Sequence, residues 1–324
     1  MFPEYRPRRL RKDELIRNLT AETKINMDKL VMPVFIDETL KGPKEIGSLP
    51  GLFTQTPESS EEYAKKLKKV GINAVLLFGI PETKDKEGSQ AYAQDGVVQR
   101  SINSFRKQNV LVITDLCMCE YTDHGHCGIL RGNDVWNDKT LEYYGKIAVS
   151  QASSGSQIIA PSGMMDGQVG AIRKALDKNG FEDIPIMAYS AKYASALYGP
   201  FRDAAKSTPS FGDRKSYQMD PANVKEAMRE IELDVEEGAD IIMVKPSLFY
   251  MDVIREASNR FDLPVAAYGV SGEYNMIMNA IKNRYISESA IPEYVTSAFR
   301  AGADIFITYF AEFLAEMPKG KDLN

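Results

Sequence analysis

Two lysines stand at the ends of apolar segments, where an ammonium group is costly to bury. Lys245 follows the run Ile241–Val244, and Lys192 ends the segment Ile184–Lys192. A β-branched run of this kind is typical of a buried strand. Burial favours the neutral amine, a nucleophile that can form a Schiff base with a carbonyl group. For either lysine taken alone, the alternative of a side chain that extends to solvent or pairs with a carboxylate stays open.

All three cysteines of the chain fall within eleven residues, as Cys117, Cys119 and Cys127. Alternation along a strand places the first two on one face, and a glycine-containing turn can return the third to them. Three thiolates with an open fourth position suit a catalytic Zn²⁺ better than a closed structural site. The alternative is three inert, buried small side chains. The only histidines, His124 and His126, lie in the same loop, where either could complete or orient the site.

A long connection follows Lys192 and reaches Asp220. Long loops of this kind are usually lids or binding loops. Arg202 and Arg214 within it can each hold a carboxylate with two hydrogen bonds, which lysine cannot do. Without the neighbouring lysines, both arginines would be interpreted as solvated surface charges.

These residues depend on a repeated strand and helix pattern for their positions. Eight apolar runs of strand length recur: Leu30–Ile36, Ile72–Gly79, Val110–Cys117, Gln157–Ser162, Ile184–Lys192, Ile241–Ser247, Pro264–Ser271 and Ile305–Phe310. The segments between them have helical spacing, including Ser59–Val70, Val169–Asn179, Pro221–Glu237 and Glu293–Ala301, and Gly71, Gly238 and Gly302 mark helix ends. The pattern predicts an α/β fold, a (β/α)8 TIM barrel. The main alternative is a doubly wound open sheet, but no Gly-rich phosphate loop follows the first run.

In such a barrel the C-terminal ends of the strands carry the chemistry. The predicted ends hold polar and reactive side chains in most of the eight units: Asp115 and Cys117, Ser162, Lys192, Lys245, Tyr268 and Ser271, and Tyr309. We therefore expect these side chains to gather at one mouth of the barrel.

Composition excludes several other classes of protein. A net charge of -5 over 324 residues gives no electrostatic reason to bind nucleic acid or an anionic membrane. No segment approaches 18 consecutive apolar residues, and the basic stretch Met1–Arg11 has no apolar signal core behind it. Three cysteines is an odd count that argues against a disulfide framework and fits a reducing cytoplasm.

The sequence also predicts how the chain is divided. Residues 1–25 precede the barrel and are predicted to form an extended arm for subunit contacts, and residues 26–324 are predicted to form the catalytic barrel.

Several strings of the sequence resemble the porphobilinogen synthase (5-aminolevulinate dehydratase) family over nearly the full length. They are Arg6–Arg11, Asp115–Gly128, Ala160–Gly167, Lys192–Ala204, Gly212–Met219, Met243–Pro246 and Tyr268–Glu273. The three cysteines resemble the zinc-dependent branch, since other members replace them. One departure is Gly163, where many members carry Asp or Ala.

The resemblance implies the condensation of two 5-aminolevulinate molecules into porphobilinogen with loss of two waters, an early step of tetrapyrrole biosynthesis. Lys245 would form the Schiff base with the first substrate, and Lys192 would engage the second or tune its partner. Zn²⁺ on the cysteines would act as a Lewis acid or hold a hydroxide. Whether the second substrate bonds to Lys192, to zinc or to both in turn stays open.

The resemblance also assigns the remaining site residues. Ser271 and Tyr309 would receive the carboxylate of the first substrate, whereas Arg202, Arg214 and Gln218 would hold that of the second. The other candidates are Tyr198 and Phe201, which would close over the pocket, Tyr268 in the substrate site, and Asp115 as an orienting or proton-handling group.

Family members form octamers in which the N-terminal arm embraces a neighbour, and many bacterial members have an allosteric Mg²⁺ site. Glu230 lies where such members place a Mg²⁺ carboxylate, although by itself it resembles an exposed helix charge. Two rival functions would each explain part of the pattern. Another Schiff-base aldolase-type lyase would share the barrel and Lys245 but would not need the cysteines. A zinc-binding interaction module would not need the lysines and arginines.

Overall fold

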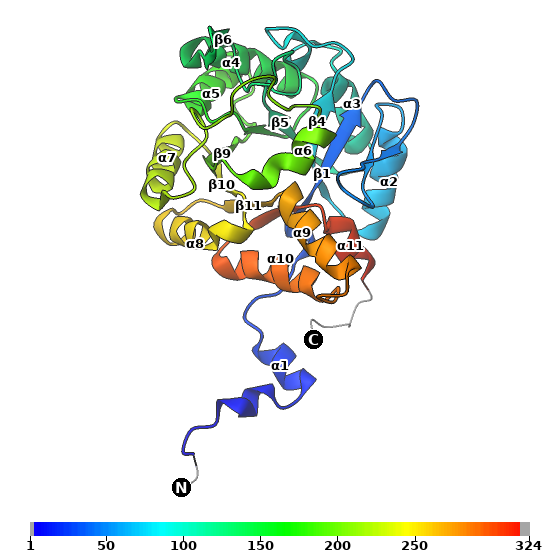
Figure 1. Cartoon of the computed structure of the whole chain (residues 1–324), viewed down its shortest axis with the longest axis vertical. Helices are drawn as coiled ribbons and strands as arrows, with labels where there is room; N and C mark the ends of the chain where they lie inside the picture. Colours follow the sequence, from blue (N-terminus) through cyan, green and yellow to red (C-terminus); the bar gives the residue numbers. More distant parts are fainter. Residues whose placement is uncertain (1–2, 318–324) are drawn as a thin grey trace.

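The eight expected strands form one closed barrel of parallel strands. The structure, a computed structural model that describes residues 3–317, has the strand order β8-β5-β4-β1-β12-β11-β10-β9 (Figure 1). A bridge between Ile159 and Ile186 joins the two ends of that order. The barrel strands are β1 (Leu30–Asp37), β4 (Ala74–Ile80), β5 (Leu111–Leu116), β8 (Ile158–Pro161), β9 (Met187–Lys192), β10 (Ile241–Lys245), β11 (Val265–Gly269) and β12 (Ile305–Thr308). The predicted barrel is confirmed, and the open sheet is excluded.

The strands read as continuous apolar runs because both of their faces are covered. Every residue of β1 and of β4 is buried, with one face toward the barrel interior and the other toward the surrounding helices. Two short hairpins lie outside the barrel: β2 (Lys44–Glu45) with β3 (Phe53–Thr54), and β6 (Leu130–Arg131) with β7 (Asp134–Val135).

Most of the helices surround the barrel, and four helices match the predicted segments 59–70, 169–179, 221–237 and 293–301. The helices that follow β1 are α2 (Ser60–Val70), α3 (Val97–Arg106), α4 (Asn137–Ser153), α5 (Gln168–Lys178), α6 (Gly199–Ala204), α7 (Val224–Glu236), α8 (Met251–Arg260), α9 (Ser271–Lys282), α10 (Ala290–Ala301) and α11 (Ala311–Glu316). Gly71 and Gly302 end α2 and α10 with φ of 92° and 118°, a left-handed conformation that glycine adopts without steric cost. Short 3-10 turns complete the order: η1 (Pro7–Arg11), η2 (Met27–Lys29), η3 (Ser89–Ala91), η4 (Ala196–Tyr198) and η5 (Leu248–Tyr250).

Some strand ends differ from the prediction. Ser247, Ser271 and Tyr309 were expected inside strands, but β10, β11 and β12 end before them. Ser271 is instead the first residue of α9, because the Glu273 carboxylate accepts a hydrogen bond from the backbone N–H of Val270 and stabilises the helix start. The apolar runs in the sequence continue beyond the ends of these three strands. The run alone therefore does not predict the residue at which each strand ends.

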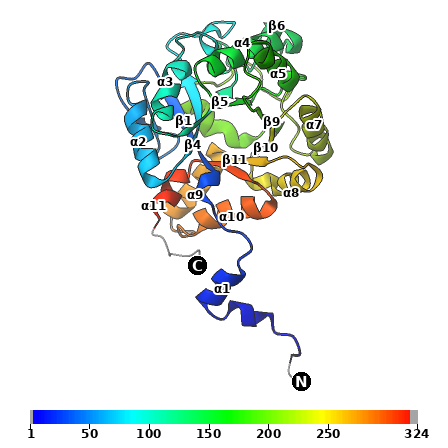
Figure 2. The same cartoon turned by 180° about the vertical axis from the view of Figure 1, so that it is seen from behind.

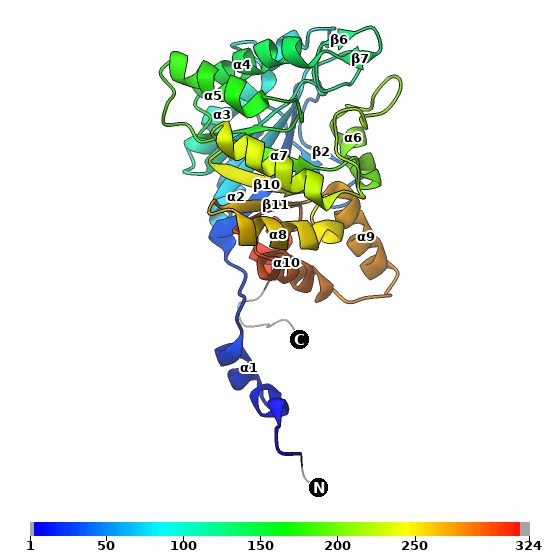
Figure 3. The same ribbon diagram turned by 90° about the vertical axis from the view of Figure 1, so that its left-hand side faces the viewer.

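The N-terminal segment lies outside the barrel. Residues 3–25, which include η1 and α1 (Glu14–Thr20), extend away from it (Figure 3), and Figure 2 shows the chain entering β1 from this side. Large apolar side chains on the arm are exposed: Tyr5 at 82%, Leu15 at 81% and Leu19 at 86%. Residues 1–2 and 318–324 of the two predicted regions lie outside the described residues. Within residues 3–317, the helices are too short or too polar to cross a bilayer.

Candidate active site

The two lysines meet at the C-terminal mouth of the barrel. Lys192 ends β9 and Lys245 ends β10, and the two residues are partners in the register of these neighbouring strands. Each is 5% exposed. The helix α6 lies across this mouth in Figure 1. The barrel rule therefore placed both lysines correctly, since the ends of parallel strands converge at one edge.

The Lys245 ammonium lies among aromatic rings. Its Nζ is 3.9 Å from the ring centroid of Tyr268, 5.0 Å from that of Tyr189, 5.2 Å from Phe201 and 5.5 Å from Tyr198. Burial is the main cause that lowers the pKa of Lys245 to about 7, and repulsion by Lys192 adds to it. A substantial share of the amine is therefore neutral near pH 7, as nucleophilic attack on a carbonyl requires.

Asp115 joins the second lysine through Ser162. The Ser162 hydroxyl donates to Asp115 Oδ2 at 3.0 Å, and the Lys192 ammonium donates to the Ser162 carbonyl. Burial raises the pKa of Asp115 to about 7, with the charge of Glu120 adding and the two lysines opposing. A carboxyl group with this pKa can both accept and return a proton near neutrality.

The three cysteines form one buried cluster, as predicted. The sulfur atoms of Cys117, Cys119 and Cys127 all lie within 4.8 Å of one another, and Cys117 Sγ is 3.4 Å from Cys119 Sγ. All three are free thiols. Hydrogen bonds from Cys117 and Cys119 hold the pKa of Cys127 well below its ordinary value, and Arg214 and Lys192 favour the thiolate further. Converging soft donors with thiolate character fit a zinc ion.

A tyrosine supports the third cysteine from behind. The Tyr144 hydroxyl donates to the Cys127 carbonyl oxygen at 2.6 Å. The same hydroxyl fills the space beside Gly163, where an added Cβ would lie only 1.6 Å from the Tyr144 oxygen. Gly163, at which this sequence differs from many family members, is therefore in contact with the tyrosine that supports the candidate zinc ligand Cys127.

The segment after β9, residues 193–220, covers the lysines and is called the covering segment. In it, the Tyr198 hydroxyl donates to the Lys245 carbonyl at 3.3 Å, and the Phe201 N–H donates to Ser271 Oγ at 2.9 Å. Tyr309, the other candidate for the first carboxylate, shares a 3.3 Å hydrogen bond with Tyr268. Tyr198 and Phe201 therefore lie beside the Lys245 ammonium, and Ser271 and Tyr309 contact two of the residues next to it, Phe201 and Tyr268.

Four side chains of this segment, those of Arg202, Ser207, Arg214 and Gln218, have buried polar atoms with no hydrogen-bond partner among residues 3–317. Gln218 is 3% exposed, and neither its amide nitrogen nor its amide oxygen has a hydrogen-bond partner among residues 3–317. The same holds within that range for the Nε atoms of Arg202 and Arg214. Buried polar atoms are nearly always satisfied in native proteins, so the N–H donors of Arg202, Arg214 and Gln218 could hold an anionic ligand.

The segment also docks on the cysteine loop, and the histidines take part in this contact. The Ser210 N–H donates to the His124 carbonyl at 3.0 Å, and Arg214 Nη2 donates to the Gly125 carbonyl at 2.9 Å. The ring nitrogens of His126 lie 3.1 Å from Tyr217 Oη and from the Phe211 carbonyl. The metal-ligand cluster found in the described chain holds neither histidine. Their structural part is to hold the covering segment.

Glu230 stands apart from the barrel mouth. It lies on α7 and lines a surface cavity with Asp134, Asp166 and Glu226. Burial raises the pKa of Glu230, and the charges of Asp166 and Glu226 raise it further. The described carboxylates here do not form a metal-ligand group as tight as that of the cysteines.

Two further residues of the site were missed by sequence reasoning. The Tyr189 ring lies under both ammonium groups, 5.0 Å from Lys245 Nζ and 5.6 Å from Lys192 Nζ. Glu120 is 3% exposed, and its Oε2 is 3.2 Å from Cys119 Sγ. Tyr189 looks like any aromatic residue of a buried strand, whereas a carboxylate directly after the second cysteine was a usable signal.

Comparison with known proteins gives one consistent result. The family model described as delta-aminolevulinic acid dehydratase matches residues 4–317. The curated delta-aminolevulinic acid dehydratase of Archaeoglobus fulgidus is 53% identical, covering 97% of this chain and 98% of its own length. That of Bacillus subtilis is 50% identical, covering 96% and 97%.

A solved structure agrees with the sequence relatives. The chain is similar to delta-aminolevulinic acid dehydratase from Toxoplasma gondii in complex with the reaction product porphobilinogen. The TM-score is 0.94 at 39% identity, with 97% of this chain and 91% of the other covered.

Proposed function

The chain belongs to the delta-aminolevulinic acid dehydratase family and has its porphobilinogen synthase activity, a hydro-lyase reaction of tetrapyrrole biosynthesis, and on this premise we propose that Lys245 is the Schiff-base residue. The observation that carries the assignment is the burial of its ammonium among four aromatic rings, which lowers the pKa to about 7. The neutral Nζ attacks the ketone carbon of the first 5-aminolevulinate, and the carbonyl oxygen leaves as water. The rival aldolase and zinc-module functions are set aside by the family membership.

The two carboxylates have separate recognition groups in this proposal. Ser271 and Tyr309 receive that of the first substrate, and Tyr268 packs beside it, supported by their position around Lys245. Arg202, Arg214 and Gln218 hold that of the second, supported by their buried atoms without partners in the described chain. Tyr198 and Phe201 cover the pair of substrates and exclude water.

Lys192 and Asp115 handle protons for the second condensation step. Lys192 is the nearest cation to Lys245 on the paired strand, and its ammonium keeps part of the Lys245 population neutral. Asp115 accepts from the Ser162 hydroxyl with one oxygen and has a pKa of about 7, which suits a group that takes a proton from substrate and returns it.

Zn²⁺ is the proposed catalytic metal, held by Cys117, Cys119 and Cys127. The three sulfurs converge within 4.8 Å and are buried, and the low pKa of Cys127 supplies thiolate character. When bound, zinc would supply Lewis acidity to the oxygen of the second substrate. The Tyr144 hydroxyl on the Cys127 carbonyl orients that ligand.

Mg²⁺ at Glu230 is a separate proposal, with an allosteric role. It is supported by the position of Glu230 in a cavity with Asp134, Asp166 and Glu226. Burial and, after it, repulsion by Asp166 and Glu226 raise the pKa of Glu230, and a bound cation would offset this repulsion. The same surface cavity is lined by Lys215 and Gln218 of the covering segment, which gives the site a route to the substrate pocket.

The arm, residues 1–25, is proposed to bind another copy of the barrel (residues 26–324) in a homo-oligomer, with the octamer of the family as the expected size. The exposed Tyr5, Leu15 and Leu19 support it, since apolar side chains of this size are usually covered by a partner. We also place the chain in the cytoplasm, because three free thiols at a metal site need reducing conditions. A native mass measurement tests the oligomer.

Reductive trapping tests the central assignment. The enzyme is incubated with 5-aminolevulinate and cyanoborohydride, and the modified peptide is located by mass spectrometry. The adduct is expected on the peptide that contains Lys245 and not on that of Lys245→Met. An adduct on the Lys192 peptide alone would reverse the two roles.

A further inference from the structure

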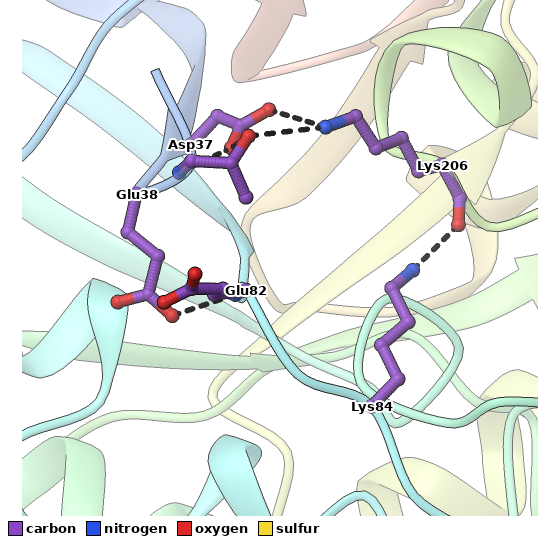
Figure 4. Close-up of polar contacts among 6 residues, drawn as sticks. Asp37, Glu38, Glu82, Lys84 and Lys206 are labelled. Atoms are coloured by element: carbon purple, nitrogen blue, oxygen red, sulfur yellow. Dashed lines mark hydrogen bonds and ion pairs between the residues drawn. The ribbon is translucent and has the colours of Figure 1, made fainter. Parts of the chain in front are cut away.

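The segment that covers the lysines is tied to the far side of the barrel at Lys206, two residues after the end of α6. The Lys206 ammonium donates to Asp37 Oδ2 at 2.8 Å and to Thr39 Oγ1 at 3.4 Å (Figure 4). The Lys206 carbonyl accepts from Lys84 Nζ at 2.6 Å. Asp37 ends β1 and is 3% exposed, so a nearly buried carboxylate of the barrel holds a residue of the cover.

The barrel side of this contact is itself well ordered. Asp37 Oδ1 accepts from the N–H and the hydroxyl of Thr39, at 2.8 and 2.7 Å. The next residue, Glu38, accepts from the Glu82 N–H at 2.7 Å and so fixes the loop that carries Lys84. Figure 4 shows Asp37 and Lys84 directed toward Lys206, and the contact between Glu38 and Glu82 apart from them. The Asp37 carboxylate is therefore held by Thr39 independently of its contact with Lys206.

The backbone of Lys206 is strained. Its φ is 50°, a left-handed conformation that a residue with a Cβ adopts at a cost in free energy. The Lys206 N–H still reaches the Asp203 carbonyl at 3.2 Å. The conformation is thus stabilised by the contacts at both ends of the residue. Loss of these contacts would favour another backbone conformation at the end of α6.

The next residue, Ser207, connects this point to both arginines of the substrate site. The Ser207 N–H donates to the Arg202 carbonyl at 3.0 Å, and its own carbonyl accepts from Arg214 Nη2 at 2.6 Å. Ser207 is fully buried. A change in the backbone at Lys206 would therefore disturb the backbone of Arg202 and the guanidinium group of Arg214, the two residues that are proposed to hold the carboxylate of the second substrate.

We propose that Lys206, held by Asp37 and Lys84, is a positioning residue that latches the segment 199–218 over the site and sets Arg202 and Arg214 for the second aminolevulinate. The latch rests on the roles proposed above for the two arginines. It touches no substrate atom. Its contribution is to fix the backbone of residues 205–207, on which the hydrogen bonds to Arg202 and Arg214 depend.

The test compares Lys206→Met with the wild-type enzyme by hydrogen exchange and by steady-state kinetics. Exchange of the amides in 205–218 should become about tenfold faster, since one charged hydrogen bond is lost from the closed state. KM for 5-aminolevulinate should rise about tenfold while kcat falls less than about threefold, the pattern of weakened binding. Trapping at Lys245 with cyanoborohydride at saturating substrate should be retained.

Matched variants separate the latch from general damage. Lys66→Met removes another half-exposed lysine from a carboxylate, Glu312, on the outside of the barrel, and it should leave exchange in 205–218 and KM unchanged. Lys206→Arg should restore both values toward wild type. Asp37→Asn, which leaves Lys206 intact, should change both in the same direction as Lys206→Met.

Two results would overturn the proposal, and they differ. Wild-type exchange in 205–218 of both Lys206→Met and Asp37→Asn would show that the contact does not latch the segment. Faster exchange with unchanged KM would show that the segment is latched but that the arginines do not bind substrate, which would refute their assigned role.

Discussion

Removal of the Lys192 ammonium should raise the pKa of Lys245 and shift the pH at which that lysine reacts. A pKa of about 7 leaves about half of Lys245 neutral at pH 7. An ordinary lysine, near 10.5, would be neutral in about one molecule in 3,000. Reactivity as a nucleophile is therefore present above pH 7 and is lost as the pH falls below it.

The size of the shift follows from the shared tyrosine. Both ammonium nitrogens lie near the Tyr189 ring centroid, at 5.0 and 5.6 Å. They are therefore no more than about 11 Å apart, and at an effective dielectric constant of about 20 their repulsion is at least about 1.5 kcal/mol, or about one pKa unit. Lys192→Met should raise the midpoint to about pH 8. It should stay well below 10.5, because burial, the larger cause, remains.

The assay is the rate of cyanoborohydride trapping of 5-aminolevulinate on the Lys245 peptide, measured from pH 5.5 to pH 9.5. Trapping is used in place of turnover because Lys192 has its own proposed part in the reaction. Lys192→Arg keeps a positive charge at the same strand end and should keep the wild-type midpoint. A midpoint in Lys192→Met that stays at the wild-type pH, or moves lower, would refute the electrostatic reasoning.

Three further predictions concern the metal, the second carboxylate and stability. Cys119→Ser should lower zinc content from about one per chain to a small fraction and abolish turnover, because only two thiolates remain; full metal content by elemental analysis would contradict the site. Gln218→Leu should raise KM about tenfold or more, since a hydrogen bond to a charged group contributes about 1.5–3 kcal/mol; unchanged saturation kinetics would remove it from the substrate site. Tyr294→Phe should lower the free energy of unfolding by about 1–3 kcal/mol, because its hydroxyl donates to the fully buried Glu273 carboxylate. Urea denaturation measures this, and a stability equal to wild type would count against that hydrogen bond.

Much of the barrel could be predicted from the sequence because its strands are covered on both faces. Apolar runs such as that before Lys245 have no other stable place in a chain of this size, and their alternation with helical segments leaves few topologies. The barrel rule then brought together Lys192, Lys245, Asp115 and the cysteines, which are far apart in sequence.

The contacts of the covering segment could not be predicted in the same way. That Lys206 pairs with Asp37 depends on how a loop folds back across the mouth, and neither residue differs in type from many exposed charges. The part of the histidines was left open for a similar reason. The ring nitrogens of His126 form hydrogen bonds with Tyr217 and with the Phe211 carbonyl, 91 and 85 residues later in the chain. The spacing of residues around the histidines gives no information about such a contact.

The close approach of Tyr144 to Gly163 has a consequence for how this family can vary. No side chain larger than hydrogen fits at 163 while a tyrosine occupies 144, since a Cβ would lie 1.6 Å from its hydroxyl oxygen and 2.5 Å from its Cζ. Relatives with Asp or Ala at the position of Gly163 should therefore carry a smaller or displaced side chain at the position of Tyr144. In an alignment the two positions should covary, although they are 19 residues apart in the sequence. A relative that combined Ala at the first position with an undisplaced tyrosine at the second would contradict this coupling.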